Sequence, residues 1–255
     1  MSDLDQFFTN SNIVDMCIAT INLDEYDIII EPSAGAGAFY NKLPNNKIGI
    51  DLCPRIDGLI KKDYLTFTPL TDDNKLLVIG NPPFGKNSSL AVKFFNHSAK
   101  FANTIAFILP RTFRKFSIIN RLCENYHLEL ETILPIDSFH LPDGTEYGVP
   151  CVWQVWKLGP IRQKMYIRTV HPDFQFVKDK SDADFLIQRV GANAGLTHKN
   201  FNKSSSSHYL IKGGDLVYQI MKKIDWTKNN SPKYDTAGNP SITKNELIEE
   251  YIKNA

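Results

Sequence analysis

The sequence predicts an α/β protein with an open, doubly wound sheet of mostly parallel strands, followed by a small β-rich extension. Two apolar runs, 28–30 and 76–79, each end abruptly in a loop of unusual composition. Ligands of open α/β sheets bind where strands end, so such loops are candidates for a site at the carboxyl edge of the sheet. After Gly159, helical patterns recede and short strand-like runs appear at 165–170, 174–177, 185–190 and 208–211. We therefore expect a core over 1–158 and a small β-rich extension with C-terminal helices over 159–255.

Composition and charge narrow the class of protein. The chain has 255 residues with 42% hydrophobic content, enough for a substantial core, and a net charge of only +1. Any nucleic-acid contact must therefore come from local clusters of Lys and Arg. Cys17, Cys53, Cys123 and Cys151 are dispersed and have no His at ligand spacing, so we expect neither a metal site nor a disulfide framework. No apolar run is long enough to span a membrane and no leader is apparent, so we expect an intracellular, soluble protein in the cytoplasm or, for a viral protein, in its host cell.

The loop after the apolar run 76–79 carries hydrogen-bond acceptors. It reads Asn81-Pro82-Pro83-Phe84-Gly85, and two consecutive prolines fix φ and remove two N–H donors. The amide oxygen of Asn81 and the carbonyl of Pro82 can therefore accept both hydrogens of a flat amino group, while Phe84 stacks on its ring. The loop is a candidate holder of an amine.

The loop after 28–30 lets backbone approach a ligand closely. Glu31-Pro32-Ser33-Ala34-Gly35-Ala36-Gly37-Ala38-Phe39 is a run of mostly small residues between a predicted strand and a predicted helix start. It lacks the longer dinucleotide fingerprint, because position 40 is Tyr, and no Gly-Lys-Ser/Thr follows. This disfavours NAD and ATP as ligands. The predicted strand 47–52 ends in Asp51, whose carboxylate can accept from vicinal ribose hydroxyls.

Three further segments, at 4–10, 63–64 and 128–158, add to the motifs already described. An amphipathic helical pattern follows the N-terminal segment Leu4-Asp5-Gln6-Phe7-Phe8-Thr9-Asn10. Asp63 and Tyr64 come after Asp51 in the chain, and we expect a hairpin over 128–158 to close the sheet. Over residues 4 to 158 the chain resembles a γ-ordered, class I, S-adenosylmethionine-dependent adenine-N6 methyltransferase of the DNA-modification type. The resemblance implies catalytic roles for Asn81, Pro82, Pro83 and Phe84. It implies cofactor-binding roles for Phe8, Thr9, Glu31, Pro32, Gly35, Gly37, Phe39, Asp51, Leu52, Asp63, Tyr64 and Asn81.

By this resemblance, the protein moves the methyl group of S-adenosylmethionine to the N6 amino group of adenine in DNA, without a metal. Three alternatives stay open: the same chemistry on RNA, protein glutamine methylation, and a non-catalytic nucleic-acid-binding partner of another methyltransferase. Glutamine methyltransferases use Asn-Pro-Pro-Tyr, so Phe84 and the segment 4–10 disfavour that alternative.

Local basic residues are candidates for nucleic-acid contact. Lys86 follows the amine-holding loop, and Arg111, Arg114 and Lys115 follow the predicted strand 104–110. In the extension, a polar, glycine-punctuated stretch over 191–203 is a candidate substrate-recognition insert or a packing extension. The sequence leaves the target sequence and the oligomeric state open.

Overall fold

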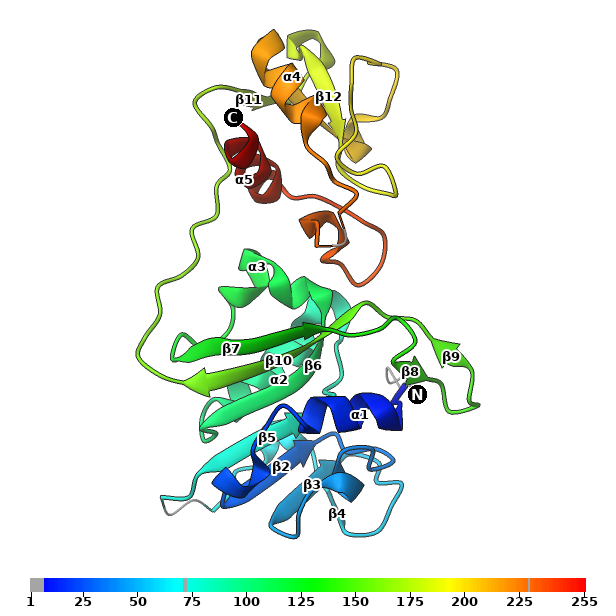
Figure 1. Ribbon diagram of the computed structural model, residues 1–255, viewed down its shortest axis with the longest axis vertical. Coiled ribbons are helices and arrows are strands. Elements are labelled where there is room, and N and C mark those ends of the chain that lie inside the picture. Colours follow the sequence, from blue (N-terminus) through cyan, green and yellow to red (C-terminus); the bar gives the residue numbers. More distant parts are fainter. Residues whose placement is uncertain (1–6, 71–72, 229) are drawn as a thin grey trace. The chain divides into compact units, whose positions relative to one another are not determined.

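The computed structural model describes residues 7–70, 73–228 and 230–255. The chain divides into two compact units, Met1–Met165 and Tyr166–Ala255 (Figure 1). Each unit has an apolar core of its own.

A seven-stranded sheet organises the first unit. Its strands are β2 (Ile28–Pro32), β3 (Lys47–Asp51), β4 (Leu59–Lys61), β5 (Leu76–Gly80), β6 (Thr104–Pro110), β7 (Tyr126–Ile133) and β10 (Cys151–Leu158). They lie in the order β4-β3-β2-β5-β6-β10-β7, and only β10 runs antiparallel to its neighbours. This is the strand order of the Rossmann-like class I methyltransferase fold, so the predicted fold class is confirmed.

Both faces of this sheet are covered. Every residue of β5 and β6 is buried, which explains their nearly continuous apolar sequences. Side chains alternate along β10: Trp153 donates to Thr20, just past α1 (Ser11–Ile18), whereas Trp156 packs on Phe95 of α2 (Ser89–Ser98). The two helices therefore pack on opposite faces.

Smaller elements complete the first unit. They include the helix α3 (Phe116–Ile119) and a three-stranded sheet of β1 (Phe8–Thr9), β8 (Phe139–His140) and β9 (Glu146–Tyr147). Pairing of β1 with β8 fixes the N-terminal segment beside the hairpin connection that leads into β10.

The expected helix after the glycine-containing loop 31–39, called the glycine loop below, is absent. Between Gly37 and Pro44 the described chain forms only turns and a short 3-10 helix, Tyr40–Lys42. Proline disfavours helical backbone at the residue before it, and Leu43 is extended, so this connection is too short for an α-helix.

The second unit is an antiparallel sheet covered by two helices. Its strands β11 (Gln175–Val177), β12 (Phe185–Gln188), β13 (Thr197–His198) and β14 (His208–Lys212) lie in the order β11-β14-β12-β13. The helices are α4 (Asp215–Lys223) and α5 (Lys244–Asn254), and α5 begins with a capping box of Thr243 and Glu246.

One expectation from the sequence in this unit was wrong. The segment 165–170 forms no strand and pairs with no described strand. The helix α4 buries Val217 and Met221 against the sheet.

Within the described residues, no helix is long and apolar enough to cross a membrane, and no group of three or more His, Cys, Asp or Glu is arranged to hold a metal ion. All four cysteines carry free thiols.

Candidate active site

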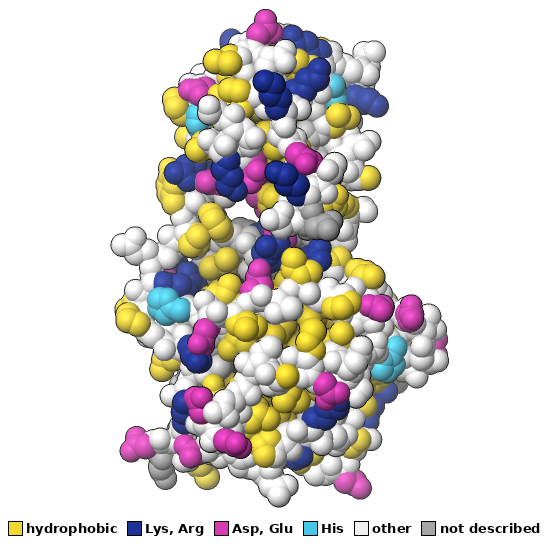
Figure 2. Space-filling model, in the orientation of Figure 1, with side chains coloured by type: hydrophobic (Ala, Val, Ile, Leu, Met, Phe, Trp, Pro, Cys, Tyr) yellow, Lys and Arg dark blue, Asp and Glu magenta, His cyan; other side chains and the backbone are white. Residues whose placement is uncertain are grey.

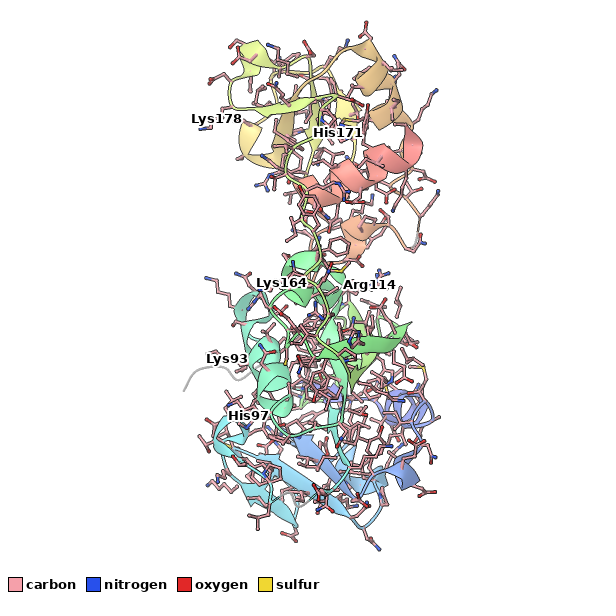
Figure 3. All side chains as sticks on the ribbon, turned by 90° about the vertical axis from the view of Figure 1, so that its left-hand side faces the viewer. Lys93, His97, Arg114, Lys164, His171 and Lys178 are labelled. Atoms are coloured by element: carbon pink, nitrogen blue, oxygen red, sulfur yellow. The ribbon has the colours of Figure 1, made fainter. Side chains whose placement is uncertain are left out.

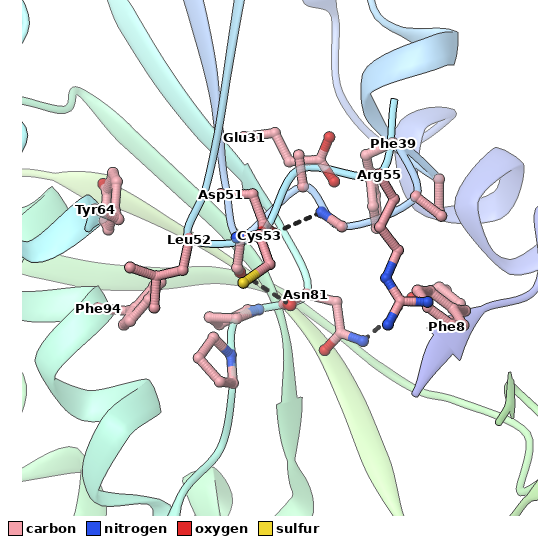
Figure 4. A pocket seen from close by; sticks show the side chains of 18 of the residues that line it. Phe8, Glu31, Phe39, Asp51, Leu52, Cys53, Arg55, Tyr64, Asn81 and Phe94 are labelled. Atoms are coloured by element: carbon pink, nitrogen blue, oxygen red, sulfur yellow. Dashed lines mark hydrogen bonds between the residues drawn. The ribbon is translucent and has the colours of Figure 1, made fainter. Parts of the chain in front are cut away.

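A cavity of about 290 Å³ opens at the carboxyl ends of β2, β3 and β5 (Figure 4). Parallel strands bring residues from distant parts of the chain to this one edge. The lining residues that the sequence predicted are Phe8, Thr9, Glu31, Gly35, Phe39, Asp51, Leu52, Asp63, Tyr64, Asn81, Pro82 and Pro83. Pro32, Gly37 and Phe84 lie outside the lining.

Asp51 ties two loops together at the centre of the cavity. One carboxylate oxygen accepts from the Gly35 N–H at 2.7 Å and the other accepts from the Cys53 N–H at 2.7 Å. Gly35 has a φ of +52°, a left-handed conformation that glycine adopts without strain. Each Asp51 oxygen retains a lone pair, so the carboxylate can still accept from a diol.

Glu31 is a buried carboxyl at the junction of β2 and the glycine loop. It is 3% exposed, and its Oε2 has no hydrogen-bond partner among the described residues. Burial raises the pKa of Glu31 well above its usual range, and the backbone N–H groups of Phe39 and Tyr40 counteract that rise only in part. A cationic or amine-bearing ligand would supply the missing partner.

Asn81 presents a second unsatisfied oxygen. Its Nδ2 donates to Thr9 Oγ1 at 3.2 Å, whereas its Oδ1 is buried and has no partner in the described part of the chain. Leaving such an acceptor unsatisfied costs about 1–3 kcal/mol. The contact with Thr9 directs the amide oxygen away from β1, so it remains available for a donor.

The ring of Phe84 lies in an aromatic cluster beside this amide. Phe84 is only 7% exposed, and Phe7 packs edge-on against it with ring centroids 5.3 Å apart. Phe7 also contacts Phe139 at 5.0 Å and Tyr147 at 5.3 Å. Phe84 is therefore packed within this cluster and lies outside the cavity lining.

At the other end of the cavity, Asp63 begins a 3-10 turn and accepts from the Leu65 N–H at 2.9 Å. Tyr64 is 2% exposed, and its hydroxyl lies 2.7 Å from that of Ser98. Burial raises the pKa of the Tyr64 phenol above its usual range. Asp63 is exposed and keeps acceptor capacity for an exocyclic amine.

Sequence reasoning missed Arg55, Cys53 and Phe7 in the lining. The guanidinium of Arg55 lies 5.0 Å from the centroid of the Phe8 ring, and the Arg55 N–H donates to the Gly35 carbonyl. The only available sequence signal was that Arg55 follows Asp51 closely. The contact between the connection after Asp51 and the glycine loop joins segments far apart in the sequence, so it is visible only in the folded structure.

The four predicted nucleic-acid contacts, Lys86, Arg111, Arg114 and Lys115, do not line the cavity. Arg114, labelled in Figure 3, donates from Nε to Glu131 at 2.9 Å. Lys86 is exposed in the short turn before α2. Leu4, Asp5 and Gln6 of the N-terminal motif lie outside the described residues.

No protein-family model and no curated protein matches this chain. Solved structures with a similar fold include a candidate RNA methyltransferase from Pyrococcus horikoshii, with a TM-score of 0.46 and 13% identity over 62% of this chain and 88% of that one. The N-methyltransferase NodS from Bradyrhizobium japonicum gives a TM-score of 0.40 and 14% identity over 59% and 94% of the two chains.

Magnesium protoporphyrin IX methyltransferase from Synechocystis, solved with S-adenosylmethionine bound, gives a TM-score of 0.41 and 10% identity over 58% and 77% of the two chains. These scores are too low for the neighbours to inform substrate or mechanism.

Proposed function

We propose that this protein transfers the methyl group of S-adenosylmethionine to the N6 amino group of adenine in DNA. The observation that carries the proposal is the pairing of Asn81 with the two prolines that follow it. The buried, unpartnered Oδ1 of Asn81 lies at the end of β5 and lines the cavity together with Pro82. An amide oxygen and a carbonyl at one point suit a donor with two hydrogens, as an exocyclic amine has.

The rest of the cavity fits the cofactor. Asp51 would accept from the ribose hydroxyls, the glycine loop would approach the ligand closely, and Asp63 would accept from the adenine amine of the cofactor. The ammonium group of the methionine moiety would favour the ionised form of Glu31, and the otherwise unpartnered Oε2 would then accept from it. Arg55 is a cation in the lining near Phe8, and it would pair with the cofactor carboxylate.

The chemistry assigned to these residues is positioning. When bound, S-adenosylmethionine supplies a methyl group activated by its sulfonium. The lone pair of an adenine amine is delocalised into the ring, and accepting both amine hydrogens at Asn81 and Pro82 favours the pyramidal, nucleophilic geometry. Holding the reacting atoms about 3–3.5 Å apart and in line lowers the activation barrier by several kcal/mol. A neutral amide cannot take up the released proton, so the proton passes to water.

The choice of DNA rests on the resemblance of the motif order to DNA-modification enzymes, because the amine-holding loop does not read the sugar. In a duplex, the target base must also leave the stack, at a cost of a few kcal/mol.

Incubation with S-adenosylmethionine carrying a labelled methyl group tests the proposal. Unmodified DNA and RNA are offered separately, and the products are digested to nucleosides. We expect label in N6-methyldeoxyadenosine from DNA. Label found only in RNA would overturn DNA as the substrate and identify RNA instead. Label in neither polymer, with cofactor still bound, would overturn the proposed reaction on nucleic acid.

A further inference from the structure

The formal charge of this protein is divided unequally between its two units. Residues 166–255 contain 13 Lys and Arg against 10 Asp and Glu, a net charge of +3, which leaves −2 on residues 1–165. A nucleic acid drawn to the cavity would therefore gain no net electrostatic attraction from the unit that holds the cavity. Figure 2 shows several Lys and Arg side chains on the visible face of the second unit.

Within the second unit the positive charge is concentrated further. Residues 185–214 contain four basic residues and no Asp or Glu, whereas 173–184 contain two lysines and four Asp. The basic residues of the acid-free stretch are Arg189, Lys199, Lys203 and Lys212. The stretch covers β12, β13, β14 and the connection 199–207, which we call the basic loop.

The basic loop is exposed and polar. The side chain of Lys199 is 53% exposed, and Lys203 is exposed as well. The loop also presents exposed amide and hydroxyl donors from Asn200, Asn202 and Ser204 to Ser206. Lys199 lies 3.4 Å from Asp215, but both side chains are well exposed, and such a pair contributes little.

Side chains of the neighbouring strands hold the basic loop in its conformation through hydrogen bonds. The Arg189 guanidinium donates from Nε and Nη2 to the Ser206 carbonyl, at 3.1 and 2.9 Å. Nδ1–H of His208 donates to the Ser204 carbonyl at 2.8 Å, and the Asn200 N–H donates to Nδ1 of His198 at 3.2 Å. A loop ordered in advance loses less conformational entropy on binding.

We propose that the basic loop is a contact surface for the phosphodiester backbone of a nucleic acid, with Lys199 and Lys203 each neutralising a phosphate. Backbone contacts are made typically by Lys and Arg together with Ser, Asn and backbone N–H groups, and this loop combines those donors without an acid of its own. The inference rests on the proposed function for the identity of the polymer. It adds that the second unit supplies the attraction that the cavity unit lacks.

The test compares two pairs of lysine substitutions in the full chain. Lys199→Gln with Lys203→Gln changes the basic loop. Lys178→Gln with Lys180→Gln makes the same change in charge at the acidic stretch, where Lys178 is labelled in Figure 3. Binding of a fluorescent DNA duplex is measured by anisotropy across a salt series, without cofactor. We expect the loop pair to reduce the slope of log K against log salt by about 2, and the control pair to leave it unchanged.

Equal losses in both pairs would assign the effect to net charge alone and overturn the proposal, as would an unchanged slope in the loop pair. Polyglutamate that competes as well as DNA at equal charge would point to an acidic protein instead, and would also overturn it. Methyl transfer is measured in parallel, and we expect the loop pair to raise KM for DNA and leave kcat unchanged. Loop-dependent binding without methylation would overturn the proposed function alone, and methylation with an unchanged KM in the loop pair would overturn this inference alone.

Discussion

The cavity of the first unit and the basic loop of the second differ in how they hold polar groups. The cavity buries oxygen atoms without partners, as at Glu31 and Asn81. The basic loop instead exposes its lysines, and its Ser204 and Ser206 carbonyls accept hydrogen bonds from His208 and Arg189. Unsatisfied buried groups are costly and gain most from one complementary ligand. Exposed charges contribute little individually, but they act over a longer range and without strict geometry.

The difference indicates a division between chemistry and attraction. The rigid ends of buried strands position a few acceptors, which suits a reaction with strict geometry. A polar loop with several cations suits a long, repetitive anion. Substitutions in the cavity should therefore produce large, specific losses, whereas substitutions in the basic loop should produce graded effects that depend on salt.

The largest expected effect is at Asn81. Asn81→Ala removes an oriented acceptor at the reacting amine, and we expect kcat to fall by about 100- to 1000-fold, with cofactor affinity unchanged. Labelled methyl transfer and a cofactor titration measure the two quantities. Asn81→Asp keeps an acceptor oxygen at the same position and is the matched control, expected to retain activity within about tenfold of the starting protein. Full turnover in the alanine variant would contradict the role assigned to Asn81.

A smaller loss is expected at Asp51. Asp51→Asn replaces one acceptor oxygen with a donor that faces the Gly35 or Cys53 N–H, so both the loop contact and the ribose contact weaken. We expect cofactor affinity to fall by about 10- to 100-fold, measured by calorimetry. Asp57→Asn, an exposed carboxylate on the same connection, should leave affinity unchanged. Equal cofactor affinity in the two variants would show that Asp51 does not contribute to cofactor binding.

Arg55 should distinguish cofactors by their carboxylate. We expect Arg55→Ala to weaken S-adenosylmethionine binding about tenfold, because one charge-assisted contact is lost. Decarboxylated S-adenosylmethionine should bind the variant and the unchanged protein equally well. Equal weakening for both ligands would mean that Arg55 supports the cavity through Phe8 and the glycine loop.

The smallest effect concerns the pH dependence of stability. The pKa of Glu31 is raised by burial, so the folded protein holds this proton at pH values where the unfolded chain has released it. Stability therefore falls as pH rises from the ordinary carboxyl range towards the folded-state pKa. Glu31→Gln cannot titrate, and its free energy of unfolding, measured in urea at pH 5 and pH 8, should rise relative to the unchanged protein as pH rises. Parallel curves would show that Glu31 is ionised in the fold.

Much of the fold could be read from the sequence because its central strands are buried on both faces. The runs ending at Ile30, Ile79 and Pro110 contain little but apolar residues, and each forms a strand of the sheet. The glycine loop and the proline loop follow two of these strands directly, so their meeting at one edge was predictable. The missing helix after Gly37 was not, because small residues after a strand fit a tight turn as well as a helix start.

The sequence by itself determined the order of the motifs and the chemical type of each loop, because strand, turn and acceptor patterns are local properties of the chain. Only the tertiary structure decided which acceptors remain without partners, that Arg55 reaches Phe8, and that Phe7 covers Phe84. It also decided that Arg189 fixes the conformation of the basic loop. These features depend on contacts between residues far apart in the chain, and burial and partner geometry exist only once the strands have packed.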